Sequence, residues 1–141
     1  MAAKITGGCL CGQIKIEIAA EPVMAVHCHC TDCQKTSGSG HTEHLLFPKA
    51  ATKISGKVSE YRSKADSGNT KTGAFCPNCG SPVYGTSSGF PDMLTVRAGT
   101  LDDPGIFRPQ MAVYAVRRPK WDYMDPALPS VDRMPQMQKS A

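Results

Sequence analysis

The stretch Cys76-Pro77-Asn78-Cys79-Gly80 restricts the fold of this chain more than any other part of its sequence. A Cys-Pro-x-Cys-Gly segment folds as a tight turn whose backbone N–H groups point at the two sulfurs. That arrangement stabilises thiolates and places two ligands on one metal ion. The same cysteine spacing occurs in redox-active dithiols, but no strand–helix–strand pattern surrounds residues 76–80. The segment therefore predicts half of a zinc site.

The other five cysteines occur in two groups, Cys9-Leu10-Cys11 and Cys28-His29-Cys30-Thr31-Asp32-Cys33. Side chains alternate along an extended segment, so the two cysteines of a Cys-x-Cys pair face the same way and can bind one ion. Cys33 falls in the first turn of a short helix that we expect Thr31 to cap. The positive end of the helix dipole favours a thiolate there. Both groups are therefore suited to metal binding.

Seven thiolates divide over two ions as four and three. Structural zinc almost always has four protein ligands, whereas catalytic zinc keeps one position for water or substrate. Spacing alone does not say which Cys-x-Cys pair joins Cys76 and Cys79, but the group at 28–33 already supplies three sulfurs. We therefore expect two Zn²⁺ ions per chain, a closed site of Cys9, Cys11, Cys76 and Cys79 and an open site of Cys28, Cys30 and Cys33.

Two closed sites would require an eighth ligand, and four histidines lie near the second group. His27 and His29 alternate with Cys28 and Cys30, so on a strand they face away from that metal, and we expect them to be packed or surface residues. His41 or His44 could reach the metal from the following segment. Whether one of these two histidines closes the second site stays open at the level of sequence.

Short β-prone segments, separated by Gly, Pro, Asn and Asp, make up most of the remaining chain. They predict a mainly β domain with one short helix near the second cysteine group. The segment from Arg117 contains four prolines and is expected to wrap over the domain in extended form, pinned by Trp121. The expected strands cover residues 13–18, 23–27, 43–47, 58–62, 72–75, 82–84, 93–98 and 110–116.

The length of 141 residues is typical of one domain. We expect a single zinc-binding domain over residues 1–131 and a loose tail over 132–141. The N-terminus lacks the apolar run of a signal peptide and no stretch is long enough to cross a bilayer, so we expect a cytoplasmic protein with no membrane partner. An odd number of clustered cysteines in a reducing compartment favours metal binding over disulfides.

The formal net charge of +4 gives little support to a nucleic-acid partner. Seven thiolates and two Zn²⁺ ions together add −3, which lowers the net charge of the metal-loaded chain to +1. The basic segment 49–71 contains few aromatic residues, and only 6% of the chain is aromatic, so a platform for stacking bases is not expected. A solvated surface is the better interpretation of that segment.

In their order and spacing, these cysteine groups resemble the glutathione-dependent formaldehyde-activating enzyme family, which includes the centromere protein V type of domain. The matching segments are residues 8–12, 28–39 and 75–81, and Trp121 and Leu128-Pro129 are similar to the closing segment of the family. The resemblance implies a β-tent of antiparallel sheets with zinc-ribbon character. It also implies a structural zinc on the set of four cysteines and a catalytic zinc on Cys28, Cys30 and Cys33.

The resemblance further implies a carbon–sulfur lyase that joins glutathione to formaldehyde and gives S-hydroxymethylglutathione. The expected partner is then a small-molecule thiol, either glutathione or an adduct of it. The chain departs from the family pattern at Gln110-Met111, where members often carry a histidine, and at His41, where the usual residue is bulky and apolar. Two alternatives therefore stay open: a paralogue with a different thiol-adduct substrate, and a zinc-ribbon binding module with two structural zincs. The sequence does not indicate the oligomeric state.

Overall fold

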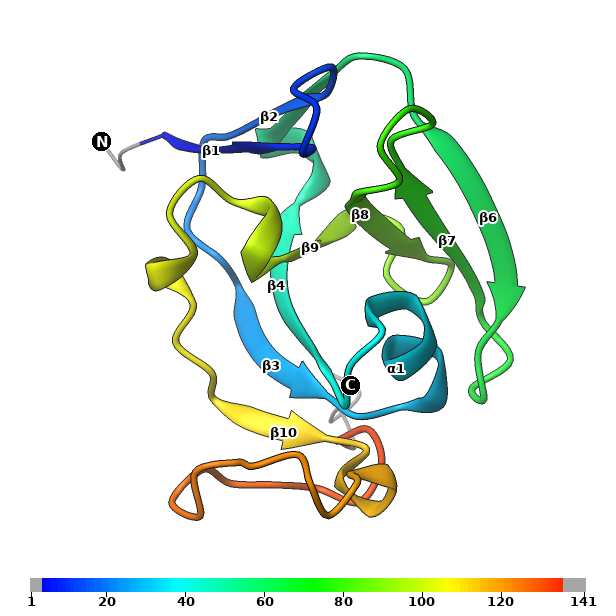
Figure 1. Cartoon of the computed structure of the whole chain (residues 1–141), viewed down its shortest axis with the longest axis vertical. Coiled ribbons are helices and arrows are strands. Elements are labelled where there is room, and N and C mark those ends of the chain that lie inside the picture. The colour runs from blue at the N-terminus through cyan, green and yellow to red at the C-terminus, as the bar shows by residue number, and fades with distance from the viewer. Residues whose placement is uncertain (1–3, 136–141) are drawn as a thin grey trace, which may run out of the picture. The chain divides into compact units, whose positions relative to one another are not determined.

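The computed structural model describes residues 4–135, which divide into two compact units. Unit 1 contains residues 4–24 and 44–107, and unit 2 contains residues 25–43 and 108–135. Residues 4–135 are mainly β, with one short α-helix beside the second cysteine group, and this prediction is confirmed (Figure 1). Of the tail predicted over 132–141, residues 136–141 lie outside the described part. Within residues 4–135, no helix has the length and hydropathy needed to cross a bilayer.

A three-stranded antiparallel sheet in unit 1 follows the order β1-β2-β5. The strands are β1 (Ile5–Gly8), β2 (Lys15–Ile18) and β5 (Thr52–Ser55), and Ile16 pairs with Gly7 on one side and Ile54 on the other. Ile14, Ile16 and Ile18 are fully buried, whereas the residues between them are exposed. The apolar residues of the alternating pattern predicted over residues 13–18 therefore form the core-facing side of this sheet.

A second antiparallel series in unit 1 follows the order β4-β9-β8-β7-β6. Its inward-facing residues, among them Phe47, Leu45, Val83 and Val96, are almost completely buried. The β7–β8 hairpin of this series carries the Cys76–Cys79 turn between its two strands. The strands are β4 (Thr42–Pro48), β6 (Ser59–Lys64), β7 (Thr70–Phe75), β8 (Pro82–Ser87) and β9 (Met93–Arg97). Short 3₁₀ turns cover Lys49–Ala51, Ala98–Thr100 and Pro104–Ile106.

Unit 2 contains β3 (Met24–Cys28), helix α1 (Thr31–Ser37), β10 (Met111–Val113) and a 3₁₀ turn at Ala115–Arg117. β10 runs parallel to β3, with Val113 opposite Cys28, so this pair departs from the antiparallel pairing of unit 1. On the other side of β10, the N–H of Ala112 donates to the carbonyl of Pro129, and the N–H of Val131 donates to that of Ala112. Residues 129–131 therefore follow β10, whereas turns at 120–121 and 126–127 interrupt the segment before them. The prediction of an extended segment from Arg117 is confirmed only in part.

Helix α1 begins differently from the prediction. Cys30, not Thr31, is the N-cap, and its sulfur accepts the N–H of Cys33 at 3.3 Å. The helix ends at Gly38, which adopts the left-handed conformation with φ of 70° and donates its N–H to the carbonyl of Gln34. A sulfur that caps a helix is held in one place, and this cap therefore fixes the position of the Cys30 thiol relative to Cys33.

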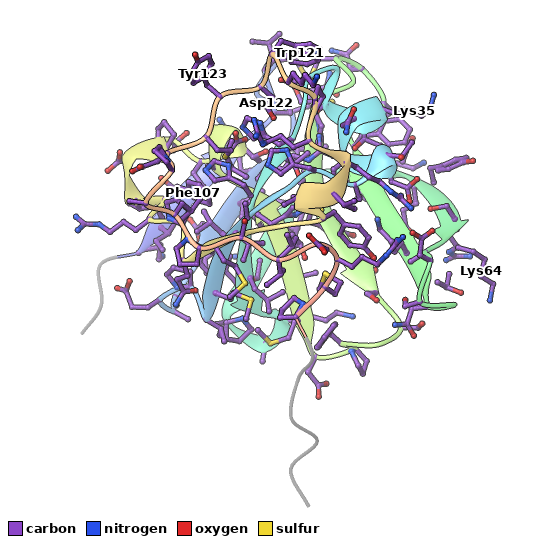
Figure 2. The ribbon with its side chains drawn as sticks, turned by 90° about the horizontal axis from the view of Figure 1, so that it is seen from below. Lys35, Lys64, Phe107, Trp121, Asp122 and Tyr123 are labelled. Atoms are coloured by element: carbon purple, nitrogen blue, oxygen red, sulfur yellow. The ribbon has the colours of Figure 1, made fainter. Side chains whose placement is uncertain are left out.

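The prediction that Trp121 pins the C-terminal segment is wrong, because its side chain is 69% exposed. The anchor is Asp122, which is 7% exposed and lies between two outward-pointing aromatic residues, Trp121 and Tyr123 (Figure 2). Its carboxylate lies against Gly40, where an added Cβ would meet Asp122 Oδ2 at 2.6 Å and Cγ at 2.7 Å. The absence of a side chain at residue 40 is what allows the carboxylate to enter.

A Gly40→Ala variant is expected to lose about 1–3 kcal/mol of unfolding free energy, the usual cost of forcing extra atoms into a packed site. Urea unfolding measures this loss directly. The matched control is Gly99→Ala, because a Cβ at residue 99 meets no atom within 4 Å. Equal stability of the two variants would show that Asp122 is not packed against Gly40 as described.

Candidate metal sites

The first cysteine group of unit 1 brings four sulfurs together from two turns. Cys9 and Cys11 lie in the turn after β1, and Cys76 and Cys79 lie in the turn between β7 and β8. The four Sγ atoms lie within 4.8 Å of one another, with 3.6 Å between Cys9 and Cys11 and 3.7 Å between Cys11 and Cys76. Tetrahedral zinc with Zn–S bonds of about 2.3 Å separates its sulfurs by about 3.8 Å. The donor set therefore fits one zinc ion.

The geometry of the first Cys-x-Cys pair differs from the extended segment predicted for it. Residues 9–13 form a turn, in which the N–H of Gly12 donates to the carbonyl of Cys9 and Gly12 adopts a positive φ of 82°. The N–H of Ile14 donates to the Cys9 sulfur at 3.2 Å. The turn still directs both sulfurs to one point. Cys9 and Cys11 therefore face the same way, as predicted, but because of a turn and not because of an extended segment.

Hydrogen bonds at the Cys76–Cys79 turn favour a thiolate at Cys79, as the sequence pattern predicts. At Cys76 the backbone N–H groups lower the pKa, but burial and the neighbouring thiols outweigh them and raise it. The N–H of Cys79 lies 3.5 Å from the Cys76 sulfur. The hydroxyl of Ser81 lies 3.3 Å from the Cys79 sulfur and accepts the N–H of Leu10 at 3.0 Å, so it joins the two turns. The hydrogen bond from the Ser81 side chain, followed by those of the Ser81 and Cys11 backbones, lowers the pKa of Cys79 to about 5.

A Ser81→Ala variant is expected to release zinc from this site at a higher pH than the wild type. The wild-type hydroxyl stabilises the thiolate and lowers the pKa of Cys79, so protons displace the ion only under more acidic conditions. Removing a hydrogen-bond partner of a ligand typically weakens metal binding about 10–100-fold. A colorimetric chelator can follow zinc release against pH. Ser63→Ala, at the opposite end of the β6–β7 hairpin from Cys76, is the control, and identical release curves would refute the role of Ser81.

The second cysteine group, in unit 2, is buried and surrounded by apolar residues. Cys28 ends β3, Cys30 caps α1 and Cys33 lies in its first turn. The three thiols form one cluster with Val113, and four partly buried residues pack against it: Val26, Met111, Tyr114 and Val131. The structure therefore brings together the three cysteines that the sequence assigns to one site.

In this cluster the pKa values of Cys28 and Cys33 are both raised. Hydrogen bonding with the Cys30 and Cys33 thiols, together with burial, raises the pKa of Cys28 far above its usual range. For Cys33, the hydrogen bond with Cys28 lowers the pKa, but the interaction with Cys30 and burial outweigh it and raise the pKa to about 11. A divalent cation would allow these thiols to ionise together, and Cys28, Cys30 and Cys33 are the residues that could hold it.

The histidines near the second group are not equivalent. The His27 and His29 side chains lie next to carboxylates, His27 next to Glu43 and His29 next to Asp122, which the sequence did not predict. Both ring nitrogens of His41 also face carboxylates, Nε2 at 2.8 Å from Glu43 and Nδ1 at 2.7 Å from Asp122. His41 is thus committed to a different cluster. His44 belongs to unit 1, and the sequence left its role as a fourth ligand as an open alternative to the predicted open site.

The polar residues that follow Cys33 in the chain have local roles. Lys35, Ser37 and Ser39 are exposed, and Ser37 Oγ accepts the N–H of Ser39 and donates to the carbonyl of His41, as in a turn. Sequence reasoning missed Tyr114, which packs against the cysteine cluster with a positive φ of 54°, a conformation that no other non-glycine residue of 4–135 adopts. Its ring lies 5.6 Å from the Arg117 guanidinium. No sequence pattern indicates such a backbone conformation.

Fold and site together define a mainly β protein with two cysteine clusters that can hold metal ions. The chain belongs to the glutathione-dependent formaldehyde-activating enzyme family, whose sequence profile matches residues 4–117 and so includes all seven cysteines. The resemblance seen in the sequence is therefore confirmed. The family supports a formaldehyde-activating function and glutathione as a small-molecule partner.

One solved structure supports the fold independently. The crystal structure of a Rhodobacter sphaeroides protein, a structural-genomics target, is similar to this chain with a TM-score of 0.56 and 19% sequence identity. The similarity covers 69% of this chain and 87% of the other. No curated protein matches the chain in a sequence search.

Proposed function

We propose that this chain is a zinc-dependent carbon–sulfur lyase that forms S-hydroxymethylglutathione, or a closely related thiol adduct, from a glutathione-type thiol and a small aldehyde. The observation that carries the proposal is that the two cysteine clusters differ in size: four sulfurs within 4.8 Å of one another in unit 1, and three buried cysteines in unit 2. A zinc ion with three protein ligands keeps one position for an outside ligand. The family to which the chain belongs supplies the nature of the thiol and of the aldehyde.

The two clusters are given different roles. Cys9, Cys11, Cys76 and Cys79 would hold a structural zinc that ties two turns of unit 1 together. Cys28, Cys30 and Cys33 would hold the catalytic zinc. The support for this division is the sulfur count and the apolar surroundings of the second cluster. We propose that residues 1–131 form the zinc-binding domain. We also propose that the protein is located in the cytoplasm, where a reducing environment keeps cysteines as thiols.

Cys28, Cys30 and Cys33 would hold the zinc ion, whose positive charge would stabilise a thiolate near neutral pH and polarise a carbonyl oxygen. The protein residues provide position and environment. The cap contact of Cys30 and the β3–β10 pairing of Cys28 hold their sulfurs on fixed elements. Val26, Met111 and Val113 keep water away from the sulfurs, which strengthens the electrostatic interactions at the site.

The test is the rate of S-hydroxymethylglutathione formation from glutathione and formaldehyde, measured by NMR exchange on the zinc-loaded protein. The reaction also proceeds without enzyme, so the expected result is a rate that rises in proportion to protein concentration and disappears when a chelator removes zinc. A second aldehyde and a thiol lacking the glutamyl group define the substrate class. No acceleration with any thiol–aldehyde pair would contradict the proposal and favour a binding module with two structural zincs.

A further inference from the structure

Unit 2 contains a second cluster of metal-binding side chains that the proposed function does not use. It consists of three imidazoles and two carboxylates, contributed by β3, the segment after α1, the start of β4 and the C-terminal segment. The side chains of His27 and His41 are 16% and 17% exposed, and that of Glu43 is 37% exposed. His29 is fully buried and Asp122 nearly so. The members are His27, His29, His41, Glu43 and Asp122.

His41 is at the centre of this cluster because a carboxylate faces each of its ring nitrogens. Nδ1 lies 2.7 and 2.9 Å from the two oxygens of Asp122, and Nε2 lies 2.8 Å from Glu43 Oε1. A neutral imidazole carries one N–H and can donate to only one of these groups. The second contact therefore requires either one more proton, on the imidazole or on a carboxylate, or a metal ion between one nitrogen and its carboxylate.

On the side of His41 that faces Glu43, three side chains that can bind a metal ion come together. His27 Nδ1 lies 4.0 Å from Glu43 Oε1, and the rings of His27 and His41 meet edge to face with centroids 4.9 Å apart. One ligand atom from each of the three residues lies within 4.8 Å of the other two. Two metal–ligand bonds of about 2.1 Å at 90–110° separate their ligand atoms by about 3.0–3.4 Å. The contacts of 2.8 and 4.0 Å to Glu43 lie on either side of that range.

The side of His41 that faces Asp122 has the geometry of a supporting hydrogen bond. A metal-bound histidine usually donates its other N–H to a carboxylate, which fixes the ring and its tautomer. Asp122 accepts at His41 Nδ1, and His29 Nδ1, 3.1 Å from Asp122 and 3.0 Å from the Gly40 carbonyl, lies beside the same carboxylate. With neutral imidazoles, the charges of Glu43 and Asp122 sum to −2, which one divalent ion balances.

We propose that His27, His41 and Glu43 form a third metal site, independent of the cysteines, for a divalent transition-metal ion that favours imidazole and carboxylate ligands. Zn²⁺ is the probe. Asp122 is a positioning residue that holds His41 through its Nδ1–H. Three protein ligands leave the ion open positions, and the partial exposure of Glu43 allows it to exchange with solution. The competing account is a His41 cation between two carboxylates, which would bind no ion.

The proposal is tested by the zinc content of the full chain after dialysis against buffered Zn²⁺. The wild type is expected to bind one ion beyond the two held by cysteines. His41→Ala and Glu43→Gln are expected to weaken this additional ion at least about 100-fold, and Asp122→Asn about 10–100-fold. Glu17→Gln, which removes an exposed carboxylate of unit 1, is expected to change nothing. A wild type that binds only two ions, or an additional ion that persists in Glu43→Gln, would overturn the proposal.

X-ray absorption on the wild type makes the result independent of how the variants fold. The additional equivalent of zinc is expected to add only nitrogen and oxygen neighbours, at about 2.0–2.2 Å. Sulfur neighbours around this equivalent would place it at the cysteines and overturn the proposal. Because the cysteine sites are read out by their sulfur neighbours, failure of this site is distinguishable from failure of the proposed enzyme function.

Discussion

A Cys76→Ser variant is expected to lose the zinc ion of the first cysteine cluster and to lose the folded structure of unit 1 at ordinary temperature. The Cys76 sulfur is completely buried and lies 3.7 Å from that of Cys11, so no other group can replace it. Structural zinc contributes about 10–16 kcal/mol in small zinc domains. That is comparable with the entire stability of an ordinary domain, about 5–15 kcal/mol. Metal analysis and thermal unfolding by circular dichroism measure the two effects.

The outcome that would contradict this account is a Cys76→Ser protein with the zinc content and melting temperature of the wild type. Cys79→Ser removes a second sulfur ligand from the same site, with a smaller effect on packing because Cys79 is only partly buried. It is expected to lose the same ion. If Cys79→Ser lost zinc while Cys76→Ser did not, the four sulfurs would not share one ion.

A Cys28→Ser variant is expected to show the opposite pattern, with loss of activity and retention of fold. The substitution removes one of three sulfurs from the buried cluster in unit 2, but leaves the four-sulfur site of unit 1 intact. We expect the rate of adduct formation to fall by at least about 100-fold, the upper end of what a change in the surroundings of a ligand costs. NMR exchange measures the rate, and metal analysis is expected to show that zinc remains at the first cluster.

Cys28→Ser and Cys76→Ser serve as controls for each other, because each replaces one buried cysteine with the same residue. If Cys28→Ser kept full activity, the catalytic role of the second cluster would be refuted. If it lost activity only because the whole chain unfolded, the urea unfolding curve would show it. A stable, inactive Cys28→Ser protein beside an unstable Cys76→Ser protein is the combination that the two roles require.

The parts of the structure that the sequence predicted are those set by local rules. The Cys76–Cys79 turn follows from its own five residues, and β2 follows from the alternation of Ile14, Ile16 and Ile18 with polar residues. The end of helix α1 at Gly38 follows such a rule too, because glycine accepts the left-handed conformation without strain. Fold class and the three cysteine groups could be predicted for the same reason.

The parts that were missed depend on residues far apart in the chain. β1 contains Gly7 and Gly8, which weaken any strand pattern, and it forms because β2 pairs with it. β5 likewise lies at an edge beside β2. Gly40 and Asp122, which are in contact, lie 82 positions apart in the sequence. From residue type alone, the large apolar Trp121 was a better candidate for an anchor than the small charged Asp122.

The candidate site shows the same division. The expectation that His27 and His29 turn away from the cysteines required only the alternation of side chains along a strand. The carboxylate neighbours of both histidines support it. Their convergence with His41 on Glu43 and Asp122 could not be predicted, because Asp122 reaches the cluster from the C-terminal segment. The positions of histidines in a sequence do not indicate which carboxylates will lie next to their side chains in the fold.

The central claim, that the second zinc is short of one protein ligand, is tested most directly by zinc X-ray absorption on the wild type loaded with two equivalents of Zn²⁺, without and with glutathione. Seven cysteine sulfurs shared by two ions give an average of 3.5 sulfur neighbours per zinc. The account predicts that glutathione raises this average toward 4. An average that glutathione does not change, together with a nitrogen neighbour that disappears in His44→Ala, would show that the protein itself closes the second site.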